Sequence, residues 1–264
     1  MPIEQELEWL LGEASEEVTT SITEGLEECL GRLCEKHSGF KLVVSSNNSE
    51  GIKGVITRAG TVIQDADILL KLHSVNKGHP FTVKLDHNSE ENVEIPLTQV
   101  VDAGNFLSEA LQIATTAFDD MTHPHKGEMA RVRISELLSY VRSAIETLKE
   151  PNSAALFPLQ PTNTKLFTDL PSDVAIDFYL KDSTVITDVR AIEYLDASGS
   201  GFNALLGRRR SDHAIPYNGR RVIVHERLRV ESQDPNLISV AVKLNTLETH
   251  LEVLKRKLDV VLAL

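Results

Sequence analysis

Few residues in this chain have the types and spacing that catalysis or cofactor binding requires. Residues 199–204 (Gly-Ser-Gly-Phe-Asn-Ala) have the outline of a dinucleotide-binding fingerprint, in which a glycine-rich turn and a helix N-terminus contact a pyrophosphate. That mechanism needs a βαβ unit around the glycines, whereas residues 207–211 (Gly-Arg-Arg-Arg-Ser) continue without one. We therefore expect a loop at this position and no bound cofactor.

The histidines offer a second candidate, a metal site. His123 and His125 flank Pro124 in a turn, but no cysteine or carboxylate cluster lies nearby in sequence to complete a coordination set. The other histidines are scattered, and no serine lies in a Gly-x-Ser-x-Gly turn of the kind that exposes a nucleophile. The sequence predicts no metal site, no catalytic residues and a protein that is not an enzyme.

A cluster of arginines stands out because the chain is acidic, with a formal net charge of −12 at pH 7. That charge argues against a nucleic-acid-binding protein and against a broad polybasic membrane surface, since both need a basic face. The cluster has two interpretations: a loop that engages an acidic partner or anionic lipid, or a solvated loop without a binding role. Its members are Arg208, Arg209, Arg210, Arg220 and Arg221.

The cysteines and the chain start bear on the cellular compartment. Cys29 and Cys34 are five positions apart in a predicted helix, which places them beyond disulfide reach and about 140° apart around the axis. This favours a reducing compartment. Acidic residues stand where a signal peptide would be basic, and no apolar run approaches the roughly 18 residues of a membrane span. We expect a cytoplasmic protein without a direct membrane span.

The C-terminal segment has an unbroken apolar heptad pattern. Apolar residues alternate at spacings of three and four, which places them on one stripe of an α-helix that other helices must cover. We interpret this stripe as the closing piece of a bundle within the chain, with homodimerisation through the last helix as the alternative. The stripe consists of Leu237, Val240, Leu244, Leu247, Leu251, Leu254, Leu258 and Val261.

Three further segments have the helical period, at residues 7–33, 97–121 and 130–148. The last two are joined by a short turn, so we expect them to form an antiparallel hairpin. Gly12, Gly25 and Gly31 weaken the first segment by up to ~1 kcal/mol each, and its helix must therefore depend on packing. With the C-terminal helix, these segments predict an antiparallel four-helix bundle.

Between the helical segments the apolar pattern changes to period two, which predicts strands. Short loops and turn residues between them favour antiparallel pairing. Residues 151–169 and 197–219 are expected to be flexible loops. The predicted strands are residues 52–57, 61–72, 81–85, 174–180, 184–192 and 221–230.

The order of these elements predicts an α+β fold in two discontinuous domains. Residues 1–40, 92–150 and 235–264 are expected to form the helical bundle. Residues 41–91 and 151–234 are expected to form an antiparallel β-sheet domain. Because each domain combines distant segments, both ends of the chain are needed to close the bundle.

Several short motifs, in this element order, resemble the Rogdi leucine-zipper-like family. The resemblance spans nearly the whole chain and includes the C-terminal heptads. Its other motifs are residues 8–11 (Glu-Trp-Leu-Leu), residues 53–57 (Lys-Gly-Val-Ile-Thr) with Gly60, residues 66–67 (Ala-Asp) with 70–71 (Leu-Lys), and residues 170–173 (Leu-Pro-Ser-Asp).

This resemblance implies a four-helix α domain with a β domain, and a role without catalysis. The family is similar to the smaller subunit of the fungal RAVE complex, which promotes assembly of the vacuolar-type proton ATPase. It therefore implies as partners a large WD-repeat subunit, an F-box adaptor protein and peripheral ATPase subunits, with recruitment to vacuolar or endosomal membranes through them. The alternatives are a homodimerising leucine-zipper scaffold and a small-molecule-binding or hydrolytic protein with a pocket between bundle and sheet.

Overall fold

The structure is a computed structural model, and it describes residues 3–36, 39–46, 50–87, 93–118, 125–195 and 213–263. The chain divides into two compact units. The helical unit comprises Met1–Lys36, Thr98–Glu150 and Pro235–Leu264, and the sheet unit comprises His37–Leu97 and Pro151–Asp234. The fold is thus α+β, and each unit is assembled from segments far apart in sequence. None of the described helices is long and apolar enough to cross a membrane.

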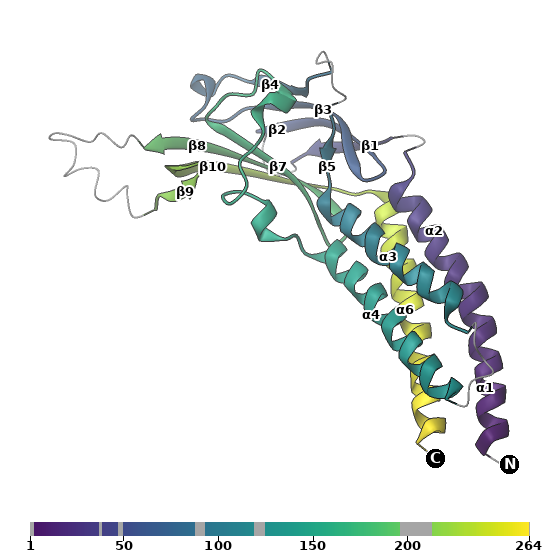
Figure 1. Ribbon diagram of the computed structural model, residues 1–264. Helices are drawn as coiled ribbons and strands as arrows, with labels where there is room; N and C mark the ends of the chain where they lie inside the picture. Colours follow the sequence, from purple (N-terminus) through teal and green to yellow (C-terminus); the bar gives the residue numbers. More distant parts are fainter. Residues whose placement is uncertain are drawn as a thin grey trace. The chain divides into compact units, whose positions relative to one another are not determined.

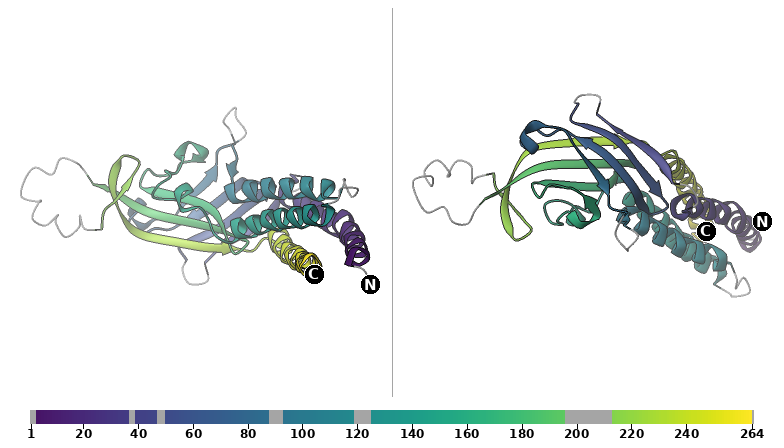
Figure 2. Two further views of the ribbon diagram at one scale, coloured as in Figure 1. Left: turned by 60° about the horizontal axis from the view of Figure 1, so that its bottom comes forward. Right: turned by 90° about the horizontal axis from the view of Figure 1, so that it is seen from above.

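The helical unit consists of four rods in the described part of the chain (Figure 1). The first rod is continuous through α1 (Ile3–Glu17), a π-helical segment (Val18–Ile22) and α2 (Thr23–Cys34). The others are α3 (Thr98–Thr116), α4 (Lys126–Lys149) and α6 (Pro235–Leu262). Both ends of the drawn chain lie at the same end of this unit (Figure 2).

The π-helical segment has a local cause in the threonines around it. The hydroxyls of Thr19 and Thr20 donate to the carbonyl oxygens of Ser15 and Glu16, at 2.7 and 2.6 Å. Such bonds compete with the regular backbone ladder and distort a helix. Val18 and Ile22 remain fully buried, so the irregular turn keeps the apolar stripe of the first rod facing the core.

Close packing between the rods depends on small residues at the contacts. α6 packs against α2 and α4, and α3 packs against α2 and α4. A Cβ on Gly25 would lie 2.8 Å from Leu247 Cδ2, and one on Gly104 would lie 3.1 Å from Cys34 Sγ. Gly25 and Gly104 therefore allow neighbouring rods to approach closely.

The sheet unit contains two antiparallel sheets. The first has the order β1 (Phe40–Ser45), β2 (Ile52–Ala59), β3 (Val62–Leu70), β4 (Phe81–Leu85) and β6 (Phe167–Thr168), with β5 (Ile95–Pro96) also pairing with β3. The second has the order β7 (Val174–Lys181), β8 (Thr184–Leu195), β10 (Arg220–Ser232) and β9 (Ile215–Tyr217). Nearly every residue of β7 and β8 is buried, so both faces of these two strands are covered, whereas β10 in the same sheet has many exposed residues.

Four strands are absent from the sequence prediction, namely β1, β5, β6 and β9. Three of them are only two or three residues long, too short for a period to be read. Pro216 lies in β9, which forms an edge of its sheet, where proline is tolerated because its missing N–H is not needed. Because β1 begins at Phe40 and β5 pairs with β3, the unit boundaries fall near residues 36 and 97 instead of 40 and 92.

The structure corrects the first expected loop and the end of the second. Residues 151–169 contain 3-10 turns at Ser153–Ala155 and Thr164–Leu166 as well as strand β6. Within residues 197–219, those from 213 onward form a turn and β9, and residues 197–212 lie outside the described residues. Side chains of Asn152 and Asn163 accept backbone N–H groups of the 3-10 turns, so local polar residues order this segment.

A buried ion pair joins the first and last parts of the sheet unit. Arg58 Nε donates to Asp234 Oδ2 at 2.5 Å, and both side chains are almost completely excluded from solvent. Arg58 Nη1 also donates to the carbonyl oxygen of Gly60. The pair lies 176 positions apart in sequence and links β2 to the end of the unit.

We predict that Asp234→Asn lowers the free energy of unfolding by about 3–5 kcal/mol, because it leaves the Arg58 guanidinium buried without an anion. Urea unfolding followed by far-ultraviolet circular dichroism measures this loss. Asp182→Asn, at an exposed turn position, is the matched control and should change stability by less than about 0.5 kcal/mol. Replacing both members of the pair by apolar residues, Arg58→Met with Asp234→Leu, should recover stability; no recovery would contradict the argument.

Candidate interaction surfaces

The glycine-rich and histidine motifs weighed in the sequence lie largely outside the described residues. Among the described residues, no group of three or more His, Cys, Asp or Glu side chains could hold a metal ion. His125 is exposed at the start of α4, and His123 lies outside the described residues, as do residues 199–204 of the glycine-rich motif.

The two cysteines have different environments on α2. Cys29 is buried, and burial raises the pKa of its thiol to about 12, with the Glu28 carboxylate adding to the shift. Cys34 is exposed. Since the thiolate is the nucleophilic form, the Cys29 environment is that of a structural core cysteine.

The densest cluster of ionised side chains lies on the second sheet, and the sequence interpretation did not include it. Asp188 on β8 is fully buried and accepts hydrogen bonds from Arg190 Nη2 at 2.6 Å and from Arg227 Nε and Nη2 at 2.9 and 2.5 Å. The Tyr179 hydroxyl donates to it at 3.2 Å. Burial, reinforced by the Asp188 charge, raises the pKa of Tyr179.

The same arginine connects a second carboxylate to this cluster. Arg190 Nη1 donates to Asp177 Oδ2 at 2.7 Å, and its guanidinium lies 4.7 Å from the centre of the Phe157 ring. Burial raises the pKa of Asp177, although the nearby Arg190 charge opposes that shift. Both carboxylates are thus paired with arginines, and the cluster binds the strands together. The sequence signals this cluster only by placing the carboxylates Asp177 and Asp188 in the middle of otherwise apolar strands.

The predicted arginine cluster is only partly described. Arg208, Arg209 and Arg210 lie outside the described residues. Arg220 lies at the start of β10 with its guanidinium 5.6 Å from the Tyr194 ring centre. Arg221 Nη2 donates to the carbonyl oxygen of Ala214 at 3.1 Å. These two arginines therefore help to hold the end of β10, and a partner-binding role for the cluster remains a prediction.

The heptad stripe of α6 faces the interior of the helical unit. Its members are all buried, and five of them are completely excluded from solvent. Those five are Leu237, Val240, Leu244, Leu251 and Leu258. A stripe that is already covered by the same chain does not offer an apolar face to a second copy.

A shallow depression on the sheet unit contains polar groups. His225 is the extra residue of a bulge in β10, and its Nε2 lies 2.5 Å from Glu193 Oε2. The His225 imidazole is therefore already hydrogen-bonded to the Glu193 carboxylate. The depression is lined by Ser74, Val75, Asp173, Ile192, Glu193, Tyr194 and His225.

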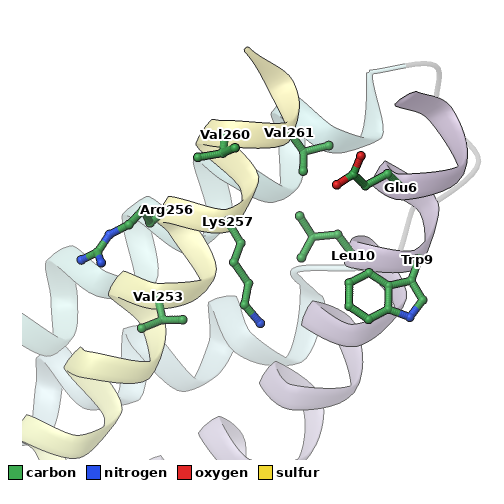
Figure 3. A pocket seen from close by; sticks show the side chains of 8 residues that line it. All are labelled: Glu6, Trp9, Leu10, Val253, Arg256, Lys257, Val260 and Val261. Carbon is green, nitrogen blue, oxygen red and sulfur yellow. The ribbon is translucent and has the colours of Figure 1, made fainter. Parts of the chain in front are cut away.

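A more apolar groove lies on the helical unit, between the start of α1 and the end of α6 (Figure 3). Its volume is about 420 Å³. Trp9 projects from the α1 wall, and Val253 and Val260 project from the α6 wall. Glu6, Leu10, Arg256, Lys257 and Val261 complete the lining. The heptad pattern alone did not indicate this groove.

Comparison with known proteins identifies the relatives of this chain. The family model described as Rogdi leucine zipper containing protein matches residues 6–207 and 203–259. The protein rogdi homolog of Danio rerio is 26% identical over 202 residues, covering 73% of this chain and 69% of that protein. The human homolog is 25% identical over 187 residues, covering 67% of this chain and 63% of that protein.

A fungal relative aligns over more of the chain. The Schizosaccharomyces pombe protein named regulator of V-ATPase in vacuolar membrane protein 2 is 21% identical over an alignment of 280 residues, covering 93% of this chain and 90% of that protein. These matches confirm the resemblance predicted from the short sequence motifs.

We predict that Leu251→Ala lowers the free energy of unfolding by about 2–5 kcal/mol, because it removes a fully buried side chain from the α6 stripe. Val242→Ala on the exposed face of the same helix should change it by less than about 0.5 kcal/mol. Thermal unfolding gives the comparison, and analytical ultracentrifugation gives the oligomeric state. A wild-type dimer that dissociates in Leu251→Ala would show that the stripe is an intermolecular zipper.

The cysteines should differ in reactivity towards iodoacetamide. At pH 8 we expect Cys34 to be alkylated and Cys29 to be spared, because a pKa of about 12 leaves almost no Cys29 thiolate. Raising the pH to 10 should accelerate labelling of Cys34 and leave Cys29 protected, and unfolding in urea should expose both. Peptide mass spectrometry identifies the labelled residue. Equal labelling of both cysteines in the native protein would contradict the burial argument.

Proposed function

Because the chain belongs to the Rogdi family, we propose that it is a non-enzymatic adaptor subunit of a RAVE-like complex. In this role it promotes assembly of the peripheral sector of the vacuolar-type proton ATPase onto the membrane sector, and so supports organelle acidification. The observation that carries the proposal is the alignment of almost the whole chain with the fission yeast regulator of V-ATPase. That alignment includes segments from both units, so the similarity extends beyond the heptads.

The proposed architecture is a four-helix bundle with an antiparallel β-sheet domain. The bundle consists of the rod from α1 to α2, the pair α3 and α4, and the closing helix α6. The mutual packing of these helices supports this arrangement, as does the burial of the α6 stripe. In this proposal the bundle is a rigid support whose outer surface, not its apolar seam, meets other subunits.

The proposed partners are a large WD-repeat subunit, an F-box adaptor protein and peripheral subunits of the ATPase. The protein works in the cytoplasm and reaches vacuolar or endosomal membranes through these partners. The carboxylates of the Asp188 cluster support a role without catalysis, since each is already engaged by an arginine. The arginines at residues 208–210 are proposed to contact an acidic surface on one of these partners.

We predict that the tagged full-length chain recovers the large WD-repeat subunit and peripheral ATPase subunits from a fungal lysate, as measured by quantitative mass spectrometry. Alanine at residues 208–210 should reduce that recovery several-fold at low salt, because charge-dependent contacts are lost. The control variant replaces three exposed lysines elsewhere by alanine and therefore has the same net charge. These lysines are Lys77, Lys149 and Lys165. A folded wild-type bait that recovers neither class of subunit would refute the proposed function.

A further inference from the structure

The contact between the first helical rod and α6 changes character along its length. Carboxylates of the rod face basic side chains of α6 at three levels: Glu28 with Lys243 at 3.0 Å, Glu17 with His250 at 3.2 Å, and Glu13 with Lys257 at 2.9 Å. Beside Lys257 of the third pair, towards the ends of the chain, exposed apolar side chains enter the rim and the groove begins. Exposed apolar side chains gathered beside a contact that is otherwise charged are typical of an interaction site.

The groove has an apolar floor and exposed apolar walls. Leu10 and Val261 are buried at its base. The exposed fractions are 68% for Trp9, 42% for Val253 and 58% for Val260. In Figure 3 the indole lies on the α1 side and the two valines on the α6 side, with Leu10 between them. Aromatic side chains in such positions are typical anchors of protein interfaces.

The shape of the groove favours a helix as its occupant. Its two walls are helices, and a third helix packs between such ridges by inserting apolar side chains at i, i+3 or i+4, and i+7. Figure 3 shows the lining side chains coming from these two helices.

The charges of the two walls indicate the chemistry of that helix. The α1 segment contains glutamates and no basic residue, and contributes Glu6 to the lining. α6 contributes Arg256 and Lys257, and Lys257 is already paired with Glu13 at 2.9 Å. Within the part of the chain that the structure describes, neither Glu6 nor Arg256 has an oppositely charged partner within 4.0 Å. An occupant with lysine or arginine on the flank over α1 and a carboxylate near Arg256 would satisfy both.

A second copy of this chain is a poorer occupant. A stable symmetric interface buries about 800 Å² on each partner, and one tryptophan with two valines supplies only part of such an area. Each copy also carries a net charge of −12, which opposes self-association.

We propose that this groove is the docking site for an amphipathic helix of the large WD-repeat subunit, with an apolar seam and a basic flank. The inference rests on the proposed function, because that function supplies the partner. Trp9 is the anchor of the contact, and Val253 and Val260 pack on the opposite side of the docked helix.

The first test measures the affinity of the purified WD-repeat subunit for matched variants of the full-length chain. Trp9→Ala and Val260→Asp should weaken binding by about tenfold or more, as expected for central interface residues. Val242→Asp places the same charge on the same helix at a residue that is 63% exposed and outside the groove, and should weaken binding less than about threefold. Circular dichroism checks that all variants keep the wild-type melting temperature.

The outcomes separate the inference from the function. Wild-type binding that Trp9→Ala and Val260→Asp leave unchanged would overturn the docking site and leave the proposed function intact. Failure of the wild-type chain to bind the WD-repeat subunit would overturn the proposed function, and the docking site with it. Concentration-dependent dimerisation that Val260→Asp abolishes, without an effect on partner binding, would identify a second copy as the occupant and refute the inference.

A spectroscopic readout at the groove itself completes the test. Trp9 is the single tryptophan of the chain, so incorporation of 5-fluorotryptophan places one ¹⁹F reporter in the groove. Binding of the WD-repeat subunit should change the chemical shift of this resonance. It should also reduce the change in chemical shift between H₂O and D₂O, because the indole becomes buried. An unchanged resonance in a complex shown to have formed would contradict the proposal.

Discussion

The helical unit depends on one constraint, which is the need to cover the apolar stripe along the whole 28-residue length of α6. The covering helices come from the beginning and the middle of the chain, so the unit forms only when three distant segments meet. Contacts of such high sequence separation cost loop-closure entropy before they stabilise the fold. The last helix is therefore a structural requirement of the unit, and its leucines are committed to the interior.

That commitment determines which surfaces remain for other molecules. With the stripe buried, the side of α6 that remains exposed is its outer face, where ion pairs connect it to the first rod and to α4. Arg142 of α4 donates to Glu248 at 2.7 Å and also to Glu252, and Arg131 lies 3.7 Å from Asp259. Exposed pairs of this kind contribute little stability each, but they keep the outer face polar. An apolar groove interrupting this polar face is more informative about binding than the heptads are.

The sequence predicted the helices well, because a stripe of spacing three and four has no structural alternative to a covered helix. It also predicted the long strands from alternation such as that of Val174, Ile176 and Phe178, although β7 is buried on both faces. Strands β5, β6 and β9 were missed because two or three residues cannot show a period, and their pairing is decided by distant partners. The Asp188 cluster was missed because its five members come from three strands, and only their register brings them together.

The groove, too, could not be predicted from the sequence. In the sequence, Trp9 stands out only as part of a family motif. Val260 lies outside the heptad stripe and therefore belongs to no periodic pattern. Their proximity depends on the antiparallel register of the first rod and α6, which the Glu13–Lys257 and Glu28–Lys243 pairs display. The apolar stripe can be recognised from one segment alone, whereas a binding surface between two helices requires the register of both. For this fold, the heptads therefore explain how the protein is built, and the exposed side chains beside them carry the information on what it binds.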